Sequence, residues 1–439
     1  MIDSHELRRR DSYLNKLIGF QDTEPVKVIT GIRRCGKSSL LKLMVQHLKD
    51  TGVLPEQIIE MNFESFDFHK MSADDVYRYV KERIITGKRM YLFFDELQRI
   101  KAWEDAVNAF RVDFDCDIYV TGSNAYLLSS EYATYLSGRC VEIKMLPLSF
   151  REFLDFHGFD VRETQSAFGG LRKQVFDKNN ERYELREVFA AYMRFGGMPG
   201  IADVGLEQEK VLALLDGIYS TVVIRDILER ETRRGQKQIT DPALLRKIIL
   251  FLADNIGSSV SIASIGNILV NEGLLDDDKR KGTPSAHTVQ AYVNALLESY
   301  FFYEIKRFDI KGKAYLRTLG KYYIVDIGLR NYLLGFRNRD SGHAIENVVY
   351  FELLRRGYDV AIGKIGNGEV DFIATTADEK KYIQVTESMM SEDVRKRELA
   401  PLQSIRDNYE KIVLSLEPGL DTSYDGIKSE NLIDWLLNE

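Results

Sequence analysis

The sequence predicts an α/β protein that begins with a parallel β-sheet and continues into a helical segment and two further modules. Two observations carry this prediction. Residues 26–30 form a short β-branched run, followed by a glycine loop and by residues 39–48, whose apolar positions have helical spacing. Residues 90–94 form a continuous apolar run, as expected for a strand buried on both faces. Both features are typical of a parallel sheet covered by helices.

The glycine loop follows the first strand-like run. It reads Gly31-Ile32-Arg33-Arg34-Cys35-Gly36-Lys37-Ser38-Ser39 and fits the pattern G-x-x-x-x-G-K-[ST]. In such a loop, backbone N–H groups converge on phosphate oxygens at a helix N-terminus. We expect all nine residues to contact a nucleotide, with Lys37 at the β- and γ-phosphates and the Ser38 hydroxyl as a ligand of Mg²⁺. The alternative is a glycine-rich turn without a ligand.

Paired carboxylates follow the apolar run at residues 90–94. Asp95 is expected to hold Mg²⁺ through its water shell, and Glu96 to polarise the attacking water, as in phosphoryl transfer. A third strand-like run leads into Ser123 and Asn124, whose small polar side chains would lie at the same sheet edge. These side chains could position water or the γ-phosphate. The pattern predicts a site for ATP with Mg²⁺.

These three features in this order resemble the AAA+ ATPase fold. Walker A corresponds to residues 31–38, Walker B to residues 91–96, and the sensor-1 position to Ser123 or Asn124. The resemblance implies ATP hydrolysis with Mg²⁺, with Asn124 positioning water. It also makes Arg139 a candidate arginine finger that completes the site of a neighbouring copy, which implies self-association. The alternative for Arg139 is an ordinary surface or capping arginine.

Residues 151–238 are interpreted as a helical lid and connector. Phe150, Phe153 and Leu154 begin a series of apolar residues at three-to-four spacing. The segment at residues 196–200, Gly-Gly-Met-Pro-Gly, resembles the lid motif in which many AAA+ relatives carry a sensor-2 arginine after the proline. Gly200 occupies that position here, and it has no side chain with which to contact a γ-phosphate.

Residues 239–335 are interpreted as a winged-helix domain. Two short amphipathic helices are expected at residues 261–269 and 285–297, the second capped by Ser285, as in a helix-turn-helix. Residues 301–305, turning to 315–317 and followed by 322–325, are expected to form a β-hairpin wing.

Charge decides whether this domain could contact DNA. The whole chain has a formal net charge of -7, so nucleic-acid affinity requires a local basic surface. The expected wing offers one, because its basic residues outnumber Glu304 and Asp309: Lys306, Arg307, Lys311, Lys313, Arg317 and Lys321. A further basic triplet at residues 279–281 lies beside three aspartates at residues 276–278. DNA is therefore a candidate partner, and the alternative is a protein-docking winged helix.

Residues 336–439 are interpreted as a small α/β domain. A helix-like stretch containing Glu346 is followed by strand-like runs containing Asp371 and Gln384, a layout that resembles PD-(D/E)xK nucleases. The resemblance implies that these three residues surround a divalent metal ion. Thr386 replaces the expected lysine two residues after Gln384, so we expect a nuclease-like fold that has lost cleavage. The alternatives are a rewired nuclease that uses Lys381 or Lys364, and purely structural roles for Glu346 and Asp371.

The complete order resembles a prokaryotic family of AAA+ ATPases with an AAA_14 core and a C-terminal DUF4143 region. We therefore expect a P-loop AAA+ core at residues 1–150, a lid and connector at 151–238, a winged helix at 239–335 and a nuclease-like domain at 336–439. The expected activity is ATP hydrolysis coupled to conformational change on DNA or on a DNA-bound partner. The alternatives are an ATP-gated DNA- or protein-binding module with negligible hydrolysis, and a nuclease regulated by the ATPase.

Length and composition agree with a folded, multidomain chain. With 439 residues the chain exceeds what one hydrophobic core usually organises, and 44% hydrophobic residues with 8 prolines argue against disorder. No run of 18 apolar residues occurs, so we expect no contact with a membrane and a cytoplasmic location. The 3 cysteines lack C-x-x-C spacing and the 6 histidines are dispersed, so the pattern supports neither a disulfide framework nor a zinc site.

Overall fold

The computed structural model describes residues 7–123, 138–165, 171–228, 239–271, 284–316, 319–337, 341–366, 368–419 and 421–438. The chain divides into two compact units. The first unit consists of Met1–Leu146 with Glu298–Tyr300, and the second of Pro147–Leu297 with Phe301–Glu439.

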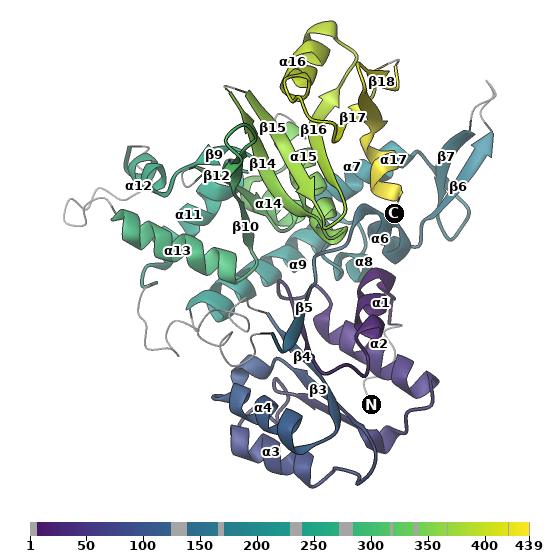
Figure 1. The fold of residues 1–439 in the computed structure, drawn as a ribbon, viewed down its shortest axis with the longest axis vertical. Coiled ribbons are helices and arrows are strands. Elements are labelled where there is room, and N and C mark those ends of the chain that lie inside the picture. The colour runs from purple at the N-terminus through teal and green to yellow at the C-terminus, as the bar shows by residue number, and fades with distance from the viewer. Residues whose placement is uncertain are drawn as a thin grey trace. The chain divides into compact units, whose positions relative to one another are not determined.

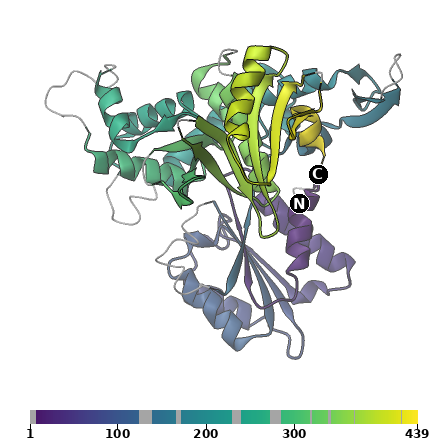
Figure 2. The same ribbon diagram turned by 45° about the horizontal axis from the view of Figure 1, so that its top comes forward.

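The first unit is built on a five-stranded parallel sheet with the strand order β2-β3-β4-β1-β5. Helices α3 and α4 cover one face of the sheet, and α1 and α2 cover the other (Figures 1 and 2). The elements in chain order are α1 (Asp11–Gly19), β1 (Val26–Thr30), α2 (Lys37–Asp50), η1 (Pro55–Gln57), β2 (Ile58–Asn62), α3 (Ala73–Lys81), β3 (Met90–Asp95), η2 (Leu97–Arg99), α4 (Trp103–Asp113), β4 (Cys116–Gly122) and β5 (Cys140–Lys144).

The central strands are largely apolar because helices cover both faces of the sheet. Every residue of β1 and β3 is buried. Phe94 of β3 stacks on Phe110 of α4, with 5.6 Å between the ring centroids. The predicted α/β class and parallel sheet are confirmed. Because all five strands are parallel, the polar residues that follow β1, β3 and β4 are brought to one edge of the sheet.

The second unit begins with helices and a small antiparallel sheet of β6, β7 and β8. The elements are α6 (Phe150–His157), β6 (Asp160–Gln165), β7 (Leu171–Phe176), β8 (Arg182–Tyr183), α7 (Leu185–Phe195), α8 (Ile201–Val204), α9 (Gln208–Thr221) and the π-helical segment η4 (Val222–Leu228).

The three strands correct the expectation that this region is wholly helical. The chain reverses between β7 and β8 at Asp177, whose carboxylate accepts the backbone N–H groups of Asn179 and Glu181 at 2.9 and 2.8 Å. Asn180 has a left-handed φ of 61°, which a helix cannot contain. Hydrogen bonding by Asp side chains to the backbone favours such turns over helices.

The next segment follows the order helix, strand, two helices and two strands. Its strands form a three-stranded sheet with the order β10-β13-β9. The elements are α11 (Pro242–Asp254), β9 (Ser259–Val260), α12 (Ile262–Asn271), α13 (Ala286–Glu298), β10 (Phe302–Ile305) and β13 (Gly320–Ile324).

The residues between β10 and β13 differ from the expected simple wing. Here β11 (Arg307–Asp309) and β12 (Ala314–Tyr315) form their own hairpin. Strand β11 then pairs in parallel with β14 (Asp359–Ile365), so the hairpin belongs to the C-terminal sheet. A hairpin can change sheets in this way because its edge strand offers unpaired backbone groups to a second strand.

The C-terminal sheet contains eight strands in the order β12-β11-β14-β15-β16-β17-β19-β18. The remaining elements are α14 (Ile327–Leu334), α15 (Ser341–Arg355), β15 (Gly368–Thr375), β16 (Lys380–Ser388), α16 (Glu392–Gln403), β17 (Glu410–Glu417), β18 (Ser423–Tyr424), β19 (Ile427–Asn431) and α17 (Leu432–Leu437).

Two adjacent residues of β15 contact helices that lie on opposite faces of this sheet. Phe372 stacks with Tyr350 of α15 at 6.3 Å between ring centroids, whereas Ile373 belongs to the core cluster that contains Leu399 and Leu402 of α16. Successive side chains of a strand point to opposite faces, so α15 and α16 enclose the sheet between them. The expected sequence of a helix and three strands is therefore present in this region.

Three chain segments meet at a buried junction inside the second unit. Gly197 donates its backbone N–H to Asp326 at 2.6 Å and accepts the N–H of Leu148 through its carbonyl at 2.7 Å. A Cβ atom at Gly197 would lie 2.4 Å from the Leu148 carbonyl oxygen, and one at Gly328 would lie 1.9 Å from the Phe195 carbonyl oxygen. Backbone approaches this close require glycine at both positions.

Asp326 is the polar centre of this junction. Its carboxylate also accepts the N–H of Leu329 at 3.0 Å and so caps α14. Burial raises the pKa of Asp326 to about 6, although the N–H groups of Gly197, Leu329 and Gly328 oppose the shift. An acid with a raised pKa stabilises the fold most when it is protonated, so this contribution is lost as the pH rises from about 4 to about 6.

We expect Asp326→Asn to flatten the dependence of stability on pH. The free energy of unfolding of the wild-type protein should fall by about 3 kcal/mol more than that of the variant between pH 4 and pH 7, because only the wild-type side chain ionises. Urea unfolding of both proteins at several pH values measures this difference. Parallel pH profiles for the two proteins would contradict the assignment.

Candidate functional site

The glycine loop connects β1 to α2 at the carboxyl edge of the parallel sheet. Gly31 has a φ of 138°, and a Cβ atom there would lie 2.1 Å from the Met145 carbonyl oxygen. Gly36 has a φ of 103° and precedes the first residue of α2. The two glycines therefore occupy positions that other residues adopt only with strain, and they give the loop the sharp turn into a helix that phosphate binding requires.

Lys37 is held against the loop itself. Its side chain is buried, and the ammonium group donates to the carbonyl oxygens of Gly31 and Ile32 at 2.9 and 3.0 Å. Ser38 and Ser39 are exposed at the start of α2. The loop thus places one ammonium group, exposed hydroxyl groups and the N-terminal N–H groups of a helix together, which suits a polyphosphate.

Asp95 and Glu96 lie at the end of β3 and are both buried. The hydroxyl of Thr121, on the neighbouring strand β4, donates to Asp95 Oδ1 at 2.5 Å and accepts the backbone N–H of Glu96 at 3.0 Å. Glu96 has a left-handed φ of 57°, so the extended backbone of β3 ends at Asp95. One hydroxyl group therefore fixes both acidic residues.

Two further residues complete the surroundings of the acidic pair. Asn62, the last residue of β2, donates to Asp95 Oδ2 at 3.0 Å, and Gln98 donates to Glu96 Oε2 at 2.6 Å. The sequence pattern did not predict a role for Asn62, Gln98 or Thr121. The polar end of β2, which lies beside β3 in the sheet, is the signal that could have identified Asn62.

Arg10 supports the glycine loop from α1 and was also missed. Its guanidinium group is buried and donates through Nη1 to the carbonyl oxygens of Cys35 and Leu146, at 3.1 and 2.8 Å. The same group lies 4.6 Å from the ring centroid of Tyr13, whose hydroxyl accepts the N–H of Leu146 at 3.1 Å. Arg10 ends a run of three arginines, and such a run has the same pattern as a charged N-terminal segment exposed to solvent.

The donor set fits Mg²⁺. This ion prefers hard oxygen ligands and is usually held by one or two protein groups together with phosphate oxygens. Asp95 presents a carboxylate whose orientation Asn62 and Thr121 fix, and Ser38 presents an exposed hydroxyl group.

The other predicted site residues are distributed as follows. Ser123 follows β4, and its hydroxyl donates to Glu96 Oε2 at 3.4 Å. Asn124 lies outside the described residues. Arg139 has an exposed side chain directly before β5, and its carbonyl oxygen accepts the N–H of Val26 at 2.9 Å. The structure thus brings together the loop, Asp95, Glu96 and Ser123 at one sheet edge.

A second polar cluster lies in the C-terminal region of the second unit. Lys321 of β13 is buried and places Nζ 2.7 Å from Glu369 and 4.0 Å from Glu346. Burial lowers the pKa of Lys321, but the carboxylates of Glu346, Asp371 and Glu369 raise it more, so the net shift is upward. Burial raises the pKa of Asp371, and Glu346 adds to the increase. The Lys321 ammonium therefore offsets part of the negative charge of the surrounding carboxylates.

This arrangement corrects the expectation for Lys321. Lys321 is engaged in buried ion pairs and does not belong to an exposed basic wing. Lys381, one candidate for a rewired nuclease, contacts Glu379 and Glu410 at 3.1 and 3.6 Å, whereas Lys321 lies beside Glu346. Gln384 lies in the same region and donates to Glu398 at 3.0 Å. Arg317 and the charged insertion at residues 276–281 lie outside the described residues.

The glycine motif at residues 196–200 takes part in the buried junction. Gly196 and Gly197 contact Asp326 and Leu148, and Gly200 precedes α8. These glycines therefore have a packing role that the comparison with a sensor-2 motif did not predict.

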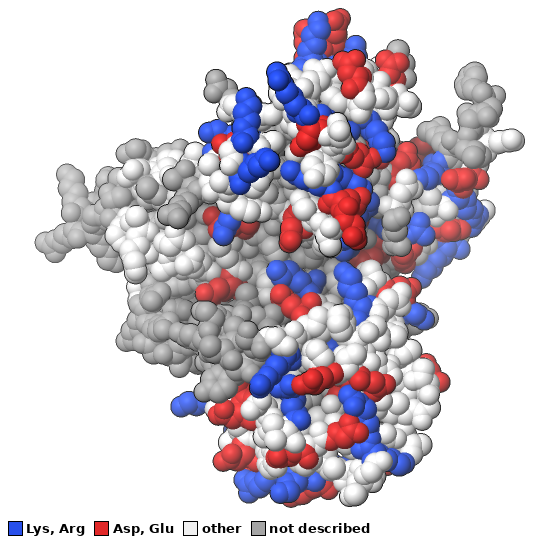
Figure 3. Space-filling view, viewed as in Figure 1, with Lys and Arg blue, Asp and Glu red and all other residues white. Residues whose placement is uncertain are grey.

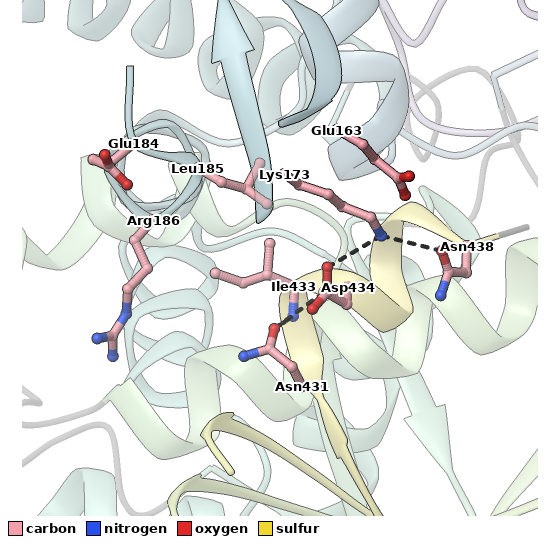
Figure 4. A pocket seen from close by; sticks show the side chains of 9 residues that line it. All are labelled: Glu163, Lys173, Glu184, Leu185, Arg186, Asn431, Ile433, Asp434 and Asn438. Carbon is pink, nitrogen blue, oxygen red and sulfur yellow. Dashed lines mark hydrogen bonds and ion pairs between the residues drawn. The ribbon is translucent and has the colours of Figure 1, made fainter. Parts of the chain in front are cut away.

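A cavity of about 530 Å³ lies between β6, β7, the start of α7 and the C-terminal helix α17. Figure 4 shows that Lys173 spans it toward α17, with Nζ 3.1 Å from Asp434 and 3.4 Å from Asn438. Arg186 pairs with Glu417 at 3.0 Å. None of the predicted site residues lines this cavity, and its two basic side chains are already paired.

Within the described parts of the chain, no helix is long and apolar enough to cross a membrane. In the same residues, no group of three or more His, Cys, Asp and Glu side chains is arranged to hold a metal ion.

Two family models match the sequence. AAA_14, an AAA domain, matches residues 23–154, and DUF8612, a domain of unknown function, matches residues 186–340. The first match supports the expected AAA+ core. For the second region, the matching model is DUF8612, and the expected resemblance to DUF4143 is not shown.

Two relatives match almost the entire chain. An uncharacterized protein of Haemophilus influenzae is 39% identical over 98% of this chain and 98% of its own length. The uncharacterized protein MJ1544 of Methanocaldococcus jannaschii is 30% identical over 95% of this chain and 85% of its own length.

Solved structures resemble the chain more weakly. The Walker-type ATPase PABY2304 of Pyrococcus abyssi has a TM-score of 0.47 and 16% identity, over 74% of this chain and 95% of that chain. The Aeropyrum pernix ORC1 protein in complex with DNA has a TM-score of 0.30 and 12% identity, over 74% of this chain and 92% of that chain.

We expect Arg10→Ala to weaken nucleotide binding by about tenfold or more, because it removes a charged donor from the Cys35 and Leu146 carbonyl oxygens. Isothermal titration with a non-hydrolysable ATP analogue measures the change. Arg9→Ala is the matched control, since the Arg9 side chain is 65% exposed and pairs only at the surface with Asp11. Equal affinities for both variants would show that Arg10 does not support the loop.

Proposed function

We propose that this chain, which belongs to the same family as its two full-length relatives and carries an AAA domain at residues 23–154, hydrolyses ATP with Mg²⁺. The observation that carries the proposal is the arrangement at one sheet edge. A phosphate-binding loop with a buried lysine lies at the same edge as a buried acidic pair oriented by Thr121.

Each residue has a specific proposed role. The backbone N–H groups of residues 31–39 and the Lys37 ammonium bind the phosphates, and Asp95 and Ser38 would hold Mg²⁺. When bound, Mg²⁺ would neutralise charge on the phosphate oxygens. Glu96 polarises the attacking water as a general base, and Asn124 positions that water. Buried donors and acids in fixed orientation suit this task because they need no reorganisation during the reaction.

Glu96 is well placed for the role of base. Its carboxylate is buried, and donors from Gln98 and Ser123 both contact Oε2. Contacts on one oxygen orient the carboxylate and leave the other oxygen for a water molecule. The left-handed backbone at Glu96 is a strained conformation for a residue other than glycine, and such strain is concentrated at functional sites.

The remaining expectations complete the proposal. Self-association would bring Arg139 to the site of a neighbouring copy, and its exposed position before β5 supports that role. The order of α11, β9, α12, α13, β10 and β13 supports a winged-helix module that contacts DNA or a DNA-bound partner. We retain the four expected domains, with cleavage lost in the last of them, and a cytoplasmic location.

We expect Glu96→Gln to retain ATP binding and to lower steady-state turnover by about 10²- to 10⁴-fold, because an amide cannot accept the proton of water. Phosphate release measures turnover, and titration with labelled ATP measures binding. Glu60→Gln is the matched control, since Glu60 is an exposed acid on β2.

Two outcomes would contradict the assignment. Equal turnover in the wild type and Glu96→Gln would show that Glu96 is not the base. Negligible turnover in the wild type despite ATP binding would favour the alternative of an ATP-gated binding module.

We expect Arg139→Ala to lower turnover by about 10³-fold, since an arginine supplied by a neighbour stabilises transition-state charge. Turnover per wild-type chain should rise with protein concentration. The decisive measurement mixes Arg139→Ala with Glu96→Gln, each inactive alone. The second variant can supply Arg139 to the intact site of the first, so activity should return in the mixture.

Arg78→Ala is the control for this experiment, because the Arg78 side chain is 69% exposed in the same unit. A mixture that stays inactive, or wild-type turnover that does not change with protein concentration, would exclude a role of Arg139 in a neighbouring site.

A further inference from the structure

A line of aromatic and basic side chains crosses one end of the eight-stranded sheet. Tyr315 of β12 contacts Phe308 of β11, with 5.2 Å between ring centroids. The ammonium group of Lys380 lies 5.8 Å from the Phe308 ring centroid and 5.2 Å from that of Tyr409. These four residues, here called the aromatic strip, come from segments that are far apart in the sequence.

The ends of the aromatic strip are accessible. Tyr315 is 61% exposed and Tyr409 is 51% exposed, which is unusual for such large rings. Phe308 between them is half-buried and packs against the core of the sheet. The strip therefore presents two open rings on a fixed base.

Tyr382 supports the strip from below. Its ring is fully buried and lies 6.5 Å from Tyr409 and 4.8 Å from the Lys380 ammonium. Its hydroxyl donates to Asp407 at 2.6 Å, two residues before Tyr409. Rings held in this way lose little conformational freedom when a ligand stacks on them.

The surface at the hairpin end of the strip is basic. Lys311 and Lys313 are exposed on the hairpin that carries Tyr315, and Lys306 is exposed directly before it. The acid of this hairpin, Asp309, accepts the backbone N–H groups of Lys311 and Gly312 at 3.0 and 3.1 Å. Figure 3 shows Lys and Arg side chains gathered over β14 and β15, beside this hairpin. In an acidic chain, this local excess of positive charge attracts a polyanion.

We propose that the aromatic strip binds single-stranded nucleic acid, with bases stacked on Tyr315 and Tyr409 and phosphates near the lysines of the hairpin. Exposed rings beside a basic surface are the combination that binds single strands, because every unpaired base offers a face for stacking. Duplex DNA keeps its bases stacked on one another, so it could use only the lysines. The inference rests on the proposed action on nucleic acid and does not depend on ATP hydrolysis.

The test is fluorescence anisotropy of the full-length protein with a labelled oligothymidine of about 15 nucleotides, beside a labelled hairpin duplex. Tyr315→Ala and Tyr409→Ala should each weaken binding of the single strand by about tenfold and leave duplex binding unchanged. Lys311→Ala should weaken binding and reduce its dependence on salt.

Matched controls test whether the loss of any exposed ring or ammonium group weakens binding. Phe66→Ala removes an aromatic ring that is 86% exposed in the first unit, and Lys396→Ala removes an ammonium whose side chain is 72% exposed on α16. Neither should change binding. Tyr315→Phe keeps the ring and should retain affinity, which separates stacking from misfolding.

Three outcomes would overturn the inference. They are absence of binding to the single strand, binding that is insensitive to both tyrosine substitutions, and equal losses for the single strand and the duplex. ATP turnover measured without nucleic acid reports separately on the proposed hydrolysis. Wild-type turnover together with no binding of the single strand would therefore reject only the aromatic strip.

Discussion

The hydroxyl group of Thr121 is the contact on which the arrangement of the acidic pair depends. It donates to Asp95 and accepts the N–H of Glu96, so a single side chain on β4 contacts both the last residue of β3 and the residue after it. This is possible only because β3 and β4 are adjacent and parallel, with the ends of both strands at the same sheet edge. The buried strands therefore serve the site by fixing where their polar ends lie. A shift in strand register would separate all three groups at once.

The conformation of the glycine loop likewise depends on contacts with distant segments of the chain. Gly31 allows the Met145 carbonyl to approach the loop, and Arg10 joins the carbonyl oxygens of Cys35 and Leu146. The loop is thus tied both to α1 and to the segment that follows β5. Pre-organisation of this kind reduces the entropy lost when a ligand binds. The contacts to Met145 and Leu146 also link the loop to the last residues before the chain enters the second unit.

The second unit shows how segments predicted as separate domains can share structural elements. The β11–β12 hairpin lies between β10 and β13 in the sequence, yet it extends the C-terminal sheet. Lys321 was expected on an exposed basic wing, but in the structure it forms ion pairs with Glu346 and Glu369. Because a buried charge is costly without partners, these ion pairs tie β13 to α15 and β15. The pairing of β11 with β14 also brings the hairpin that carries Tyr315 near Lys380 and Tyr409.

The sequence alone determined those features that depend on local pattern. The glycine loop, the two buried strands, the acidic pair and the order of the C-terminal helix and strands all follow from spacing and side-chain type. The tertiary structure decided what depends on contacts between distant segments: the roles of Arg10, Asn62 and Thr121, the β6–β8 sheet, and the ion pairs of Lys321. An isolated polar residue has the same local pattern whether it is solvated or buried against a partner. Its environment is therefore fixed only when the chain folds and brings that partner into contact.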